Sequence, residues 1–194
     1  KNQFPEAISF YRRLVDKAST GKAIYCVYKA AWSFYNLQKK WTALRHFERL
    51  LIHYRGDAQT LQEDGLNLFK ETKFDLLLVM AELMAPDAAI KELTIFNYSA
   101  EELLEAHQAL AQTYNKIGRY AQAITVYKIL LEEHITHTNA PIWLKELLQT
   151  YLSDGNRKTL SEILNLYYPR LQVGKNSAEL VADVNKIILT VHRE

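Results

Sequence analysis

The sequence predicts an all-α fold built of stacked helical hairpins. Three observations support this class. Apolar residues recur at steps of three and four along nearly the whole chain, which is the spacing of one face of a helix. Only six Gly and four Pro occur among 194 residues, too few for the many tight turns of an all-β protein. A pattern of hairpin length also repeats along the chain, which is typical of stacked repeat units.

The first half of the chain predicts long helices separated by few breakers. The first helix has Pro5 in its first turn, a position that proline favours. Further helices are expected over about 22–38 and 40–54, before a Gly-Asp pair interrupts the chain. Residues 57–84 predict either one long helix or two helices joined near Thr72.

Clear start and stop signals mark the second half. Pro86 begins a helix that ends near Asn97. Ser99 and Glu102 have the spacing of a capping box, and Gly118 ends the helix that they open. The remaining helices are expected over about 120–134, over 141–153, from 157 to just before Pro169, and over 177–192. The sequence thus predicts about ten helices and no convincing strand.

Residues Glu101–His134 form the clearest repeat unit. Small residues, Ala111 and Ala123, lie seven positions before and five after Gly118. Large aromatic residues stand at Tyr114 and Tyr127. This pattern resembles a tetratricopeptide repeat, a helix–turn–helix unit of about 34 residues in which small side chains let the two helices pack closely. The resemblance implies a right-handed α-solenoid of such hairpins with a C-terminal capping helix.

The same spacing recurs with lower fidelity at Ala31, Phe34, Ala43, Phe47 and Leu51, with Gln38 in place of the turn glycine. We therefore expect a single solenoid domain over residues 1–194. Its parts are the second helix of an incomplete repeat (1–18), a repeat (22–54), a degenerate repeat (57–97), the best-matching repeat (100–134), a divergent hairpin (140–170) and a capping helix (176–193). Because the pattern begins at a second helix, we expect a fragment of a longer protein. The alternative is an irregular helical bundle that shares one repeat by chance.

In tetratricopeptide solenoids the first helix of each pair lines a concave groove, and the resemblance implies such a groove here. From the first complete repeat it would be lined by Tyr25, Tyr28, Trp32, Tyr35 and Asn36. From the best-matching repeat it would be lined by Glu105, Gln108, Gln112, Asn115 and Lys116, and from the last hairpin by Ile142, Lys145, Gln149 and Leu152.

The four aromatic residues Tyr25, Tyr28, Trp32 and Tyr35, called the aromatic stripe below, are unusual on a face that normally meets water. Tyr and Trp commonly anchor interfaces. With flanking lysines 22, 29, 39 and 40, the stripe predicts binding of a peptide that carries apolar and acidic groups. In the alternative, a neighbouring helix packs over Tyr25 and Tyr28.

Charge is unevenly distributed along the chain. Residues 1–56 hold 11 Lys and Arg against three Asp and Glu, although the whole chain has a net charge of only +2. Such a basic segment can bind phosphates. Basic clustering is limited to Arg12-Arg13, Lys39-Lys40, Arg45 and Arg49, however, and the rest of the chain is acidic. We therefore expect a protein or peptide partner and no nucleic acid.

The sequence offers little for catalysis or for a cofactor. There is no Gly-rich phosphate loop and no nucleophile elbow. His134 and His137 could share a metal ion, but no further ligand lies close in sequence, so we expect no metal site. The single cysteine, Cys26, is interpreted as a small packing residue. No apolar run approaches the roughly 20 residues of a membrane-spanning helix.

The stretch Tyr28–Leu37, the degenerate middle and the repeat at 101–134 together resemble bacterial cell-envelope tetratricopeptide proteins, including those of gliding motility. The resemblance implies a non-catalytic scaffold in a periplasmic or envelope machine, with a cytoplasmic location also open. The alternative function is a helical accessory domain of a larger enzyme, such as a peptidoglycan lytic transglycosylase. Partner identity and oligomeric state are left open.

Overall fold

The computed structural model describes residues 3–15, 20–53, 62–63, 66–171 and 182. Its internal contacts divide the chain into two compact units, Lys1–Met84 and Ala85–Glu194. The boundary falls inside the predicted degenerate repeat 57–97. The expectation of a single domain over 1–194 therefore stays a prediction, and each unit is described on its own.

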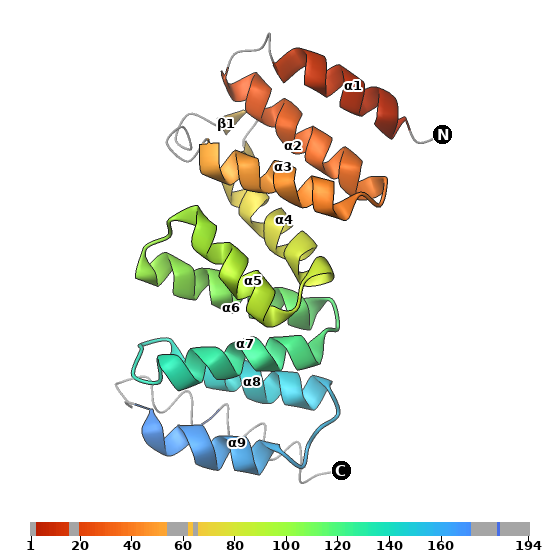
Figure 1. Cartoon of the computed structure of the whole chain (residues 1–194). Coiled ribbons are helices and arrows are strands. Elements are labelled where there is room, and N and C mark those ends of the chain that lie inside the picture. Colours follow the sequence, from red (N-terminus) through yellow and green to blue (C-terminus); the bar gives the residue numbers. More distant parts are fainter. Residues whose placement is uncertain (1–2, 16–19, 54–61, 64–65, 172–181, 183–194) are drawn as a thin grey trace. The chain divides into compact units, whose positions relative to one another are not determined.

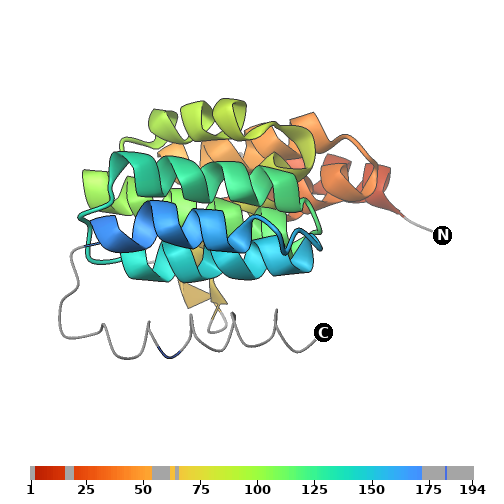
Figure 2. The same ribbon diagram turned by 90° about the horizontal axis from the view of Figure 1, so that it is seen from below.

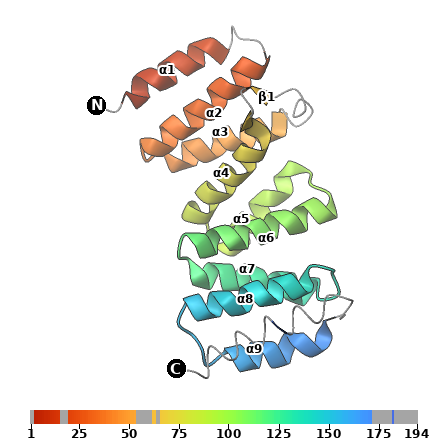
Figure 3. The same ribbon diagram turned by 180° about the vertical axis from the view of Figure 1, so that it is seen from behind.

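The first unit consists of helices that pack in chain order. They are α1 (Phe4–Val15), α2 (Thr20–Asn36), α3 (Lys40–His53) and α4 (Leu68–Leu83). Each contacts the next, and Figures 1 and 3 show the four helices following one another side by side. Helices α2 and α4 also touch, because α3 packs against both.

A short pair of strands precedes α4. Strand β1 (Gln62–Glu63) pairs antiparallel with β2 (Leu66–Asn67), with Gln62 opposite Asn67. The expectations of a helix through this segment and of no strand are therefore wrong here, and the helix begins at Leu68. The sequence carried a signal for the pairing, since Asp64-Gly65 between the two strands is a dipeptide that favours a two-residue hairpin connection.

The second unit continues with more hairpins. It contains α5 (Pro86–Leu93) with a 3₁₀ turn η2 (Thr94–Phe96), then α6 (Ala100–Lys116), α7 (Tyr120–Glu133), α8 (Ala140–Ser153), α9 (Leu160–Tyr167) and a 3₁₀ turn η3 (Tyr168–Arg170). Helix α6 packs on α7, α7 on α8 and α8 on α9. Figure 2 shows these helices lying with their axes in nearly one direction. The capping box at the start of α6 is formed as predicted, by Ser99 and Glu102.

The hairpin turns share one backbone geometry. Gln38, Gly118 and Gly155 follow the first helices and have positive φ angles of 61°, 78° and 76°. In the α6–α7 turn the Arg119 N–H donates to the Tyr114 carbonyl at 2.8 Å, and equivalent bonds close the other two turns. This is the Schellman ending of a helix, whose left-handed residue is usually glycine. Gln38 adopts the same conformation without being glycine.

Small side chains lie at the crossing points of the helices. Ala31, Ala43, Ala111 and Ala123 are fully buried, as the repeat pattern requires. Large buried rings, such as Phe47 and Tyr127, fill the space beside them. The predicted all-α class built of helical hairpins is thereby confirmed. The predicted capping helix lies outside the described residues, except for Ala182.

Candidate partner-binding site

In the first unit, two side chains of α2 hold a carboxylate of α4. The Tyr28 hydroxyl donates to Asp75 Oδ2 at 2.8 Å, and Trp32 Nε1–H donates to the same oxygen at 2.9 Å. Tyr28 and Trp32 are one helical turn apart, so both reach one acceptor. Their rings also meet Phe47 of α3 edge-on, at centroid distances of 6.0 and 5.9 Å. The inner sides of these rings therefore belong to the packing of the unit.

The same relationship recurs two turns further along both helices. The Tyr35 hydroxyl donates to Glu82 Oε1 at 2.9 Å, and Lys40 Nζ lies 3.1 Å from Glu82 Oε2. Lys40 also lies over the Tyr35 ring, 5.4 Å from its centroid. The polar tips of two stripe tyrosines are therefore already engaged by carboxylates of α4.

These contacts change the acidity of the groups involved. Burial, with the hydrogen bond to Asp75, raises the pKa of Tyr28 to about 12. Burial and the hydrogen bond to Glu82 do the same for Tyr35, whose pKa is about 12. Burial also raises the pKa of the Asp75 carboxyl, against the opposing effect of its two hydrogen-bond donors. At neutral pH both tyrosines are thus firmly protonated donors.

In the second unit, α6 and α7 hold a carboxylate of α8 in a similar way. Gln112 Nε2 donates to Glu146 Oε1 at 2.7 Å, and Gln108 Nε2 approaches Glu146 Oε2 at 3.4 Å. The Tyr127 hydroxyl also hydrogen-bonds Glu146, and burial together with this carboxylate raises the tyrosine pKa. When the two repeats are aligned on Ala31 and Ala111, Tyr28 and Trp32 correspond to Gln108 and Gln112.

A pocket of about 310 Å³ opens beside Glu146. Its lining consists of polar and aromatic side chains from α6, α7 and α8, namely Gln112, Asn115, Lys116, Tyr120, Tyr127, Glu146, Gln149 and Ser153. Three amides, one ammonium group, one carboxylate and one hydroxyl group thus face one small space together with two phenol rings. Such a lining can exchange hydrogen bonds with peptide groups, which carry both a donor and an acceptor.

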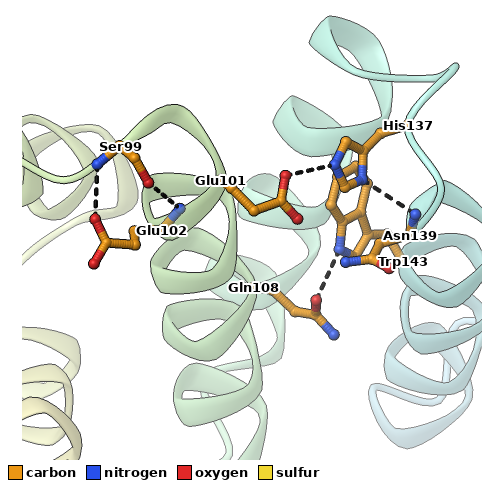
Figure 4. Close-up of polar contacts among 7 residues, drawn as sticks. All are labelled: Ser99, Glu101, Glu102, Gln108, His137, Asn139 and Trp143. Carbon is orange, nitrogen blue, oxygen red and sulfur yellow. Dashed lines mark hydrogen bonds and ion pairs between the residues drawn. The ribbon is translucent and has the colours of Figure 1, made fainter.

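A separate polar cluster joins the start of α6 to the α7–α8 loop (Figure 4). His137 Nδ1 accepts the Asn139 backbone N–H at 3.1 Å, so Nε2 carries the proton that is donated to Glu101 Oε2 at 3.1 Å. The imidazole stacks on Trp143 with an interplanar angle of 11°, and the Trp143 indole N–H donates to Gln108 Oε1 at 3.0 Å. Gln108 therefore links this cluster to Glu146.

The structure divides the predicted groove residues between the two units. Gln112, Asn115 and Lys116 line the pocket, and Gln108 adjoins it through Glu146. Tyr25 and the rest of the aromatic stripe are half-buried on α2, and Asn36 is exposed at its end. The predicted alternative of a covering helix describes part of this surface, since α4 meets the tips of Tyr28, Trp32 and Tyr35. Whether these residues bind a partner stays a prediction.

Sequence reasoning missed the acidic residues that organise both faces. Asp75, Glu82 and Glu146 are absent from the predicted groove, although its last part names Lys145 and Gln149 on either side of Glu146. One available signal was the spacing of seven between Asp75 and Glu82, which equals that between Tyr28 and Tyr35.

Within the described residues, no group of three or more His, Cys, Asp or Glu side chains is placed to hold a metal ion. His134 and His137 instead face different glutamates, at 3.9 Å from Glu133 and 3.1 Å from Glu101. None of the helices in the described ranges combines the length and apolar character needed to cross a bilayer.

Comparison with known families identifies the hairpins. The tetratricopeptide repeat model matches residues 25–56 and 105–134, which coincide with the α2–α3 and α6–α7 hairpins. These two hairpins therefore match tetratricopeptide repeats, a class of helical repeat that generally mediates protein–protein interaction.

No curated protein matches the chain. It is similar to two crystal structures of a Podosopora anserina protein named after kinesin light chain and made of nearly identical TPR-like repeats. Both are 13% identical to this chain with TM-scores of 0.42. The first, a variant, covers 87% of this chain and 86% of its own, and the second covers 99% and 90%.

Proposed function

We propose that this chain is a non-catalytic interaction scaffold that binds a peptide or a partner protein on the face formed by the first helices of its repeats. The observation that carries the proposal is the pocket of about 310 Å³, in which Asn115 and Lys116 of α6 meet Glu146 and Gln149 of α8. Four residues that the repeat pattern assigns to the groove line this pocket: Gln112, Asn115, Lys116 and Gln149.

The chemistry of this pocket suits an extended peptide. Amide side chains can pair with both groups of a peptide bond, so they bind a backbone whatever its side chains are. The volume lies at the lower end for small-molecule pockets, which span about 300–1,000 Å³, and is open at the surface. A short stretch of chain fits such a site better than a bulky cofactor.

The aromatic stripe offers a second contact in the first unit. Its hydroxyl and indole groups are bound to Asp75 and Glu82, so the half-buried ring faces are what a partner would meet. Lys29 lies over the rings of Tyr25 and Tyr28, at 5.1 and 5.8 Å from their centroids. Half-buried rings beside lysines support an apolar, acidic partner segment at this position.

Affinity capture followed by mass spectrometry tests the scaffold role, with a variant of the pocket beside the parent chain. Asn115→Ala/Lys116→Ala removes two pocket groups, and Lys91→Ala removes an exposed lysine of α5 as the matched control. We expect a captured partner to rebind the control as it binds the parent, and to bind the pocket variant at least about tenfold more weakly. Equal binding to all three proteins would exclude the pocket.

The setting in a bacterial envelope or motility machine rests on the sequence resemblance of the Tyr28–Leu37 stretch, the degenerate middle and the repeat at 101–134. Cell fractionation tests this part of the proposal, since a protein found only in the cytoplasm contradicts it. The full reading frame tests the alternative of an accessory domain, because it would encode a hydrolytic domain next to this segment.

A further inference from the structure

We propose that the pocket beside Glu146 is a socket for one basic side chain, lysine or arginine, of the bound partner segment. This inference rests on the proposed function and specifies the chemistry of its partner. It begins from the way in which the Glu146 carboxylate is held. All its hydrogen-bond donors in the described part of the chain, Gln108, Gln112 and Tyr127, are neutral. Within the described residues, neutral donors alone therefore hold the carboxylate in position.

No ion pair to Glu146 occurs among the described residues, although Lys116 lines the same pocket. A carboxylate offers about four lone-pair positions, and three donors leave room for one more. A guanidinium or ammonium group entering the pocket would supply that donor together with the missing positive charge. Charge-assisted hydrogen bonds of this kind are about twice as strong as neutral ones.

The remaining lining favours the stem of such a side chain. The rings of Tyr120 and Tyr127 flank the pocket and can pack against the methylene groups of lysine or arginine. An aromatic ring face also attracts a cation within about 6 Å. Lys116 repels a second cation nearby, so the socket should prefer a single basic residue with neutral or acidic neighbours over a polybasic tract.

Asp75, the corresponding carboxylate of the first unit, has different surroundings from Glu146. Asp75 is held by the aromatic donors Tyr28 and Trp32, and burial raises the pKa of its carboxyl. Glu146 instead faces the open pocket with two glutamine amides beside it. The shared arrangement thus anchors a helix in the first unit and places a carboxylate at the wall of an open pocket in the second.

Titration of the ¹⁵N-labelled chain with single-residue probes tests the socket without knowledge of the partner. N-acetyl-arginine amide is the cationic probe, the citrulline analogue is its neutral isostere, and N-acetyl-glutamate amide is the anionic probe. We expect the arginine probe to shift the amide resonances of Gln112, Glu146 and Gln149 saturably. Equal shifts with the citrulline probe, or stronger binding of the glutamate probe, would overturn the proposal.

Two variants make the test specific. Glu146→Gln should weaken binding of the arginine probe at least about tenfold, whereas Lys116→Gln should leave it equal or tighter. If Glu146→Gln lowers the melting temperature, Gln149→Arg replaces it, because its own guanidinium fills the socket while the hydrogen bonds of Glu146 stay in place. Unchanged probe binding in a folded Glu146→Gln or Gln149→Arg variant would exclude the socket.

The outcomes also separate this inference from the scaffold role. If the arginine probe binds in a way that depends on Glu146 but no protein partner is captured, the socket proposal stands and the scaffold role is excluded. If a partner binds through Asn115 and Lys116 and its affinity is unchanged by Glu146→Gln, the scaffold role stands and the socket proposal is excluded.

Discussion

The Tyr28 hydroxyl on α2 donates to the Asp75 carboxylate on α4 across 2.8 Å, and the residues are 47 positions apart in the chain. Tyr35 and Glu82 repeat the relationship at the same separation. These bonds join α2 to α4, so part of a surface expected to serve only partners also holds the first unit together.

Tyr28→Phe removes this hydroxyl and keeps the ring. Asp75 then loses one of its two donors, and we expect the free energy of unfolding to fall by about 1 kcal/mol. Urea denaturation measures the change, with Tyr11→Phe on α1 as the matched control. If the stripe binds partners through its ring faces, partner affinity stays unchanged in Tyr28→Phe and falls in Tyr28→Ala. Unaltered stability in Tyr28→Phe would show that the bond contributes nothing measurable.

The raised pKa of Asp75 predicts a pH dependence of stability above pH 3.8. A carboxyl whose folded-state pKa exceeds its ordinary value near 3.8 binds its proton more tightly in the folded protein. Its contribution to stability is therefore complete below pH 3.8 and is lost as the pH rises through the raised pKa. Asp75→Asn should lack this loss, so the stability of the variant relative to the parent should increase over that range. Parallel curves for the two proteins, measured by urea denaturation at several pH values, would contradict the raised pKa.

His107 predicts a pH dependence of stability whose sign is opposite to that from Asp75. Its side chain is only 9% exposed, and its Nε2 atom has no hydrogen-bond partner among the residues that the structure describes. Burial lowers its pKa, with a smaller opposing effect from Glu133. A lowered folded-state pKa contributes stability above the ordinary value near 6.5, and this stability is lost as the pH falls through the folded pKa. His107→Leu cannot titrate, so it should lose less stability than the parent on acidification below pH 6.5.

Thermal unfolding of both proteins between pH 7 and pH 5 measures the difference. His46, whose pKa burial also lowers, remains in both and cancels in the comparison. An equal fall in melting temperature for parent and variant would show that His107 does not bind its proton differently in the folded state.

The hairpin turns predict a pair of substitutions with opposite effects. Gln38 has a φ of 61°, which costs most residues about 1–2 kcal/mol, so Gln38→Gly should stabilise the first unit by about 0.5–1 kcal/mol after the entropy of glycine is included. Gly118→Ala should destabilise the second unit by about 1 kcal/mol. A Cβ at Gly118 meets no atom within 4 Å, so only backbone strain would act. Calorimetry of both variants checks the signs, and a destabilised Gln38→Gly would mean that the glutamine side chain contributes more than its strain costs.

Local pattern was sufficient to predict the hairpins. Ala111 and Ala123 stand at fixed distances from Gly118 because close helix packing and a left-handed turn each require a small residue at a set position. The capping box of Ser99 and Glu102 is equally local, since its bonds span three residues. The sequence by itself therefore determined where helices begin, cross and turn, apart from the strand pair before α4.

Only the tertiary structure decided which side chains of α2 and α6 are bound by a neighbouring helix and which remain available to a partner. The bonds from Tyr28 to Asp75 and from Gln112 to Glu146 join residues 47 and 34 positions apart. Their formation depends on how one hairpin rotates against the next, and no periodicity within a helix encodes that rotation. Packing between helices thus makes Asp75 a hydrogen-bond acceptor inside the first unit and places Glu146 at an open pocket. Each carboxylate is held where the neighbouring helices bring hydrogen-bond donors within reach of it.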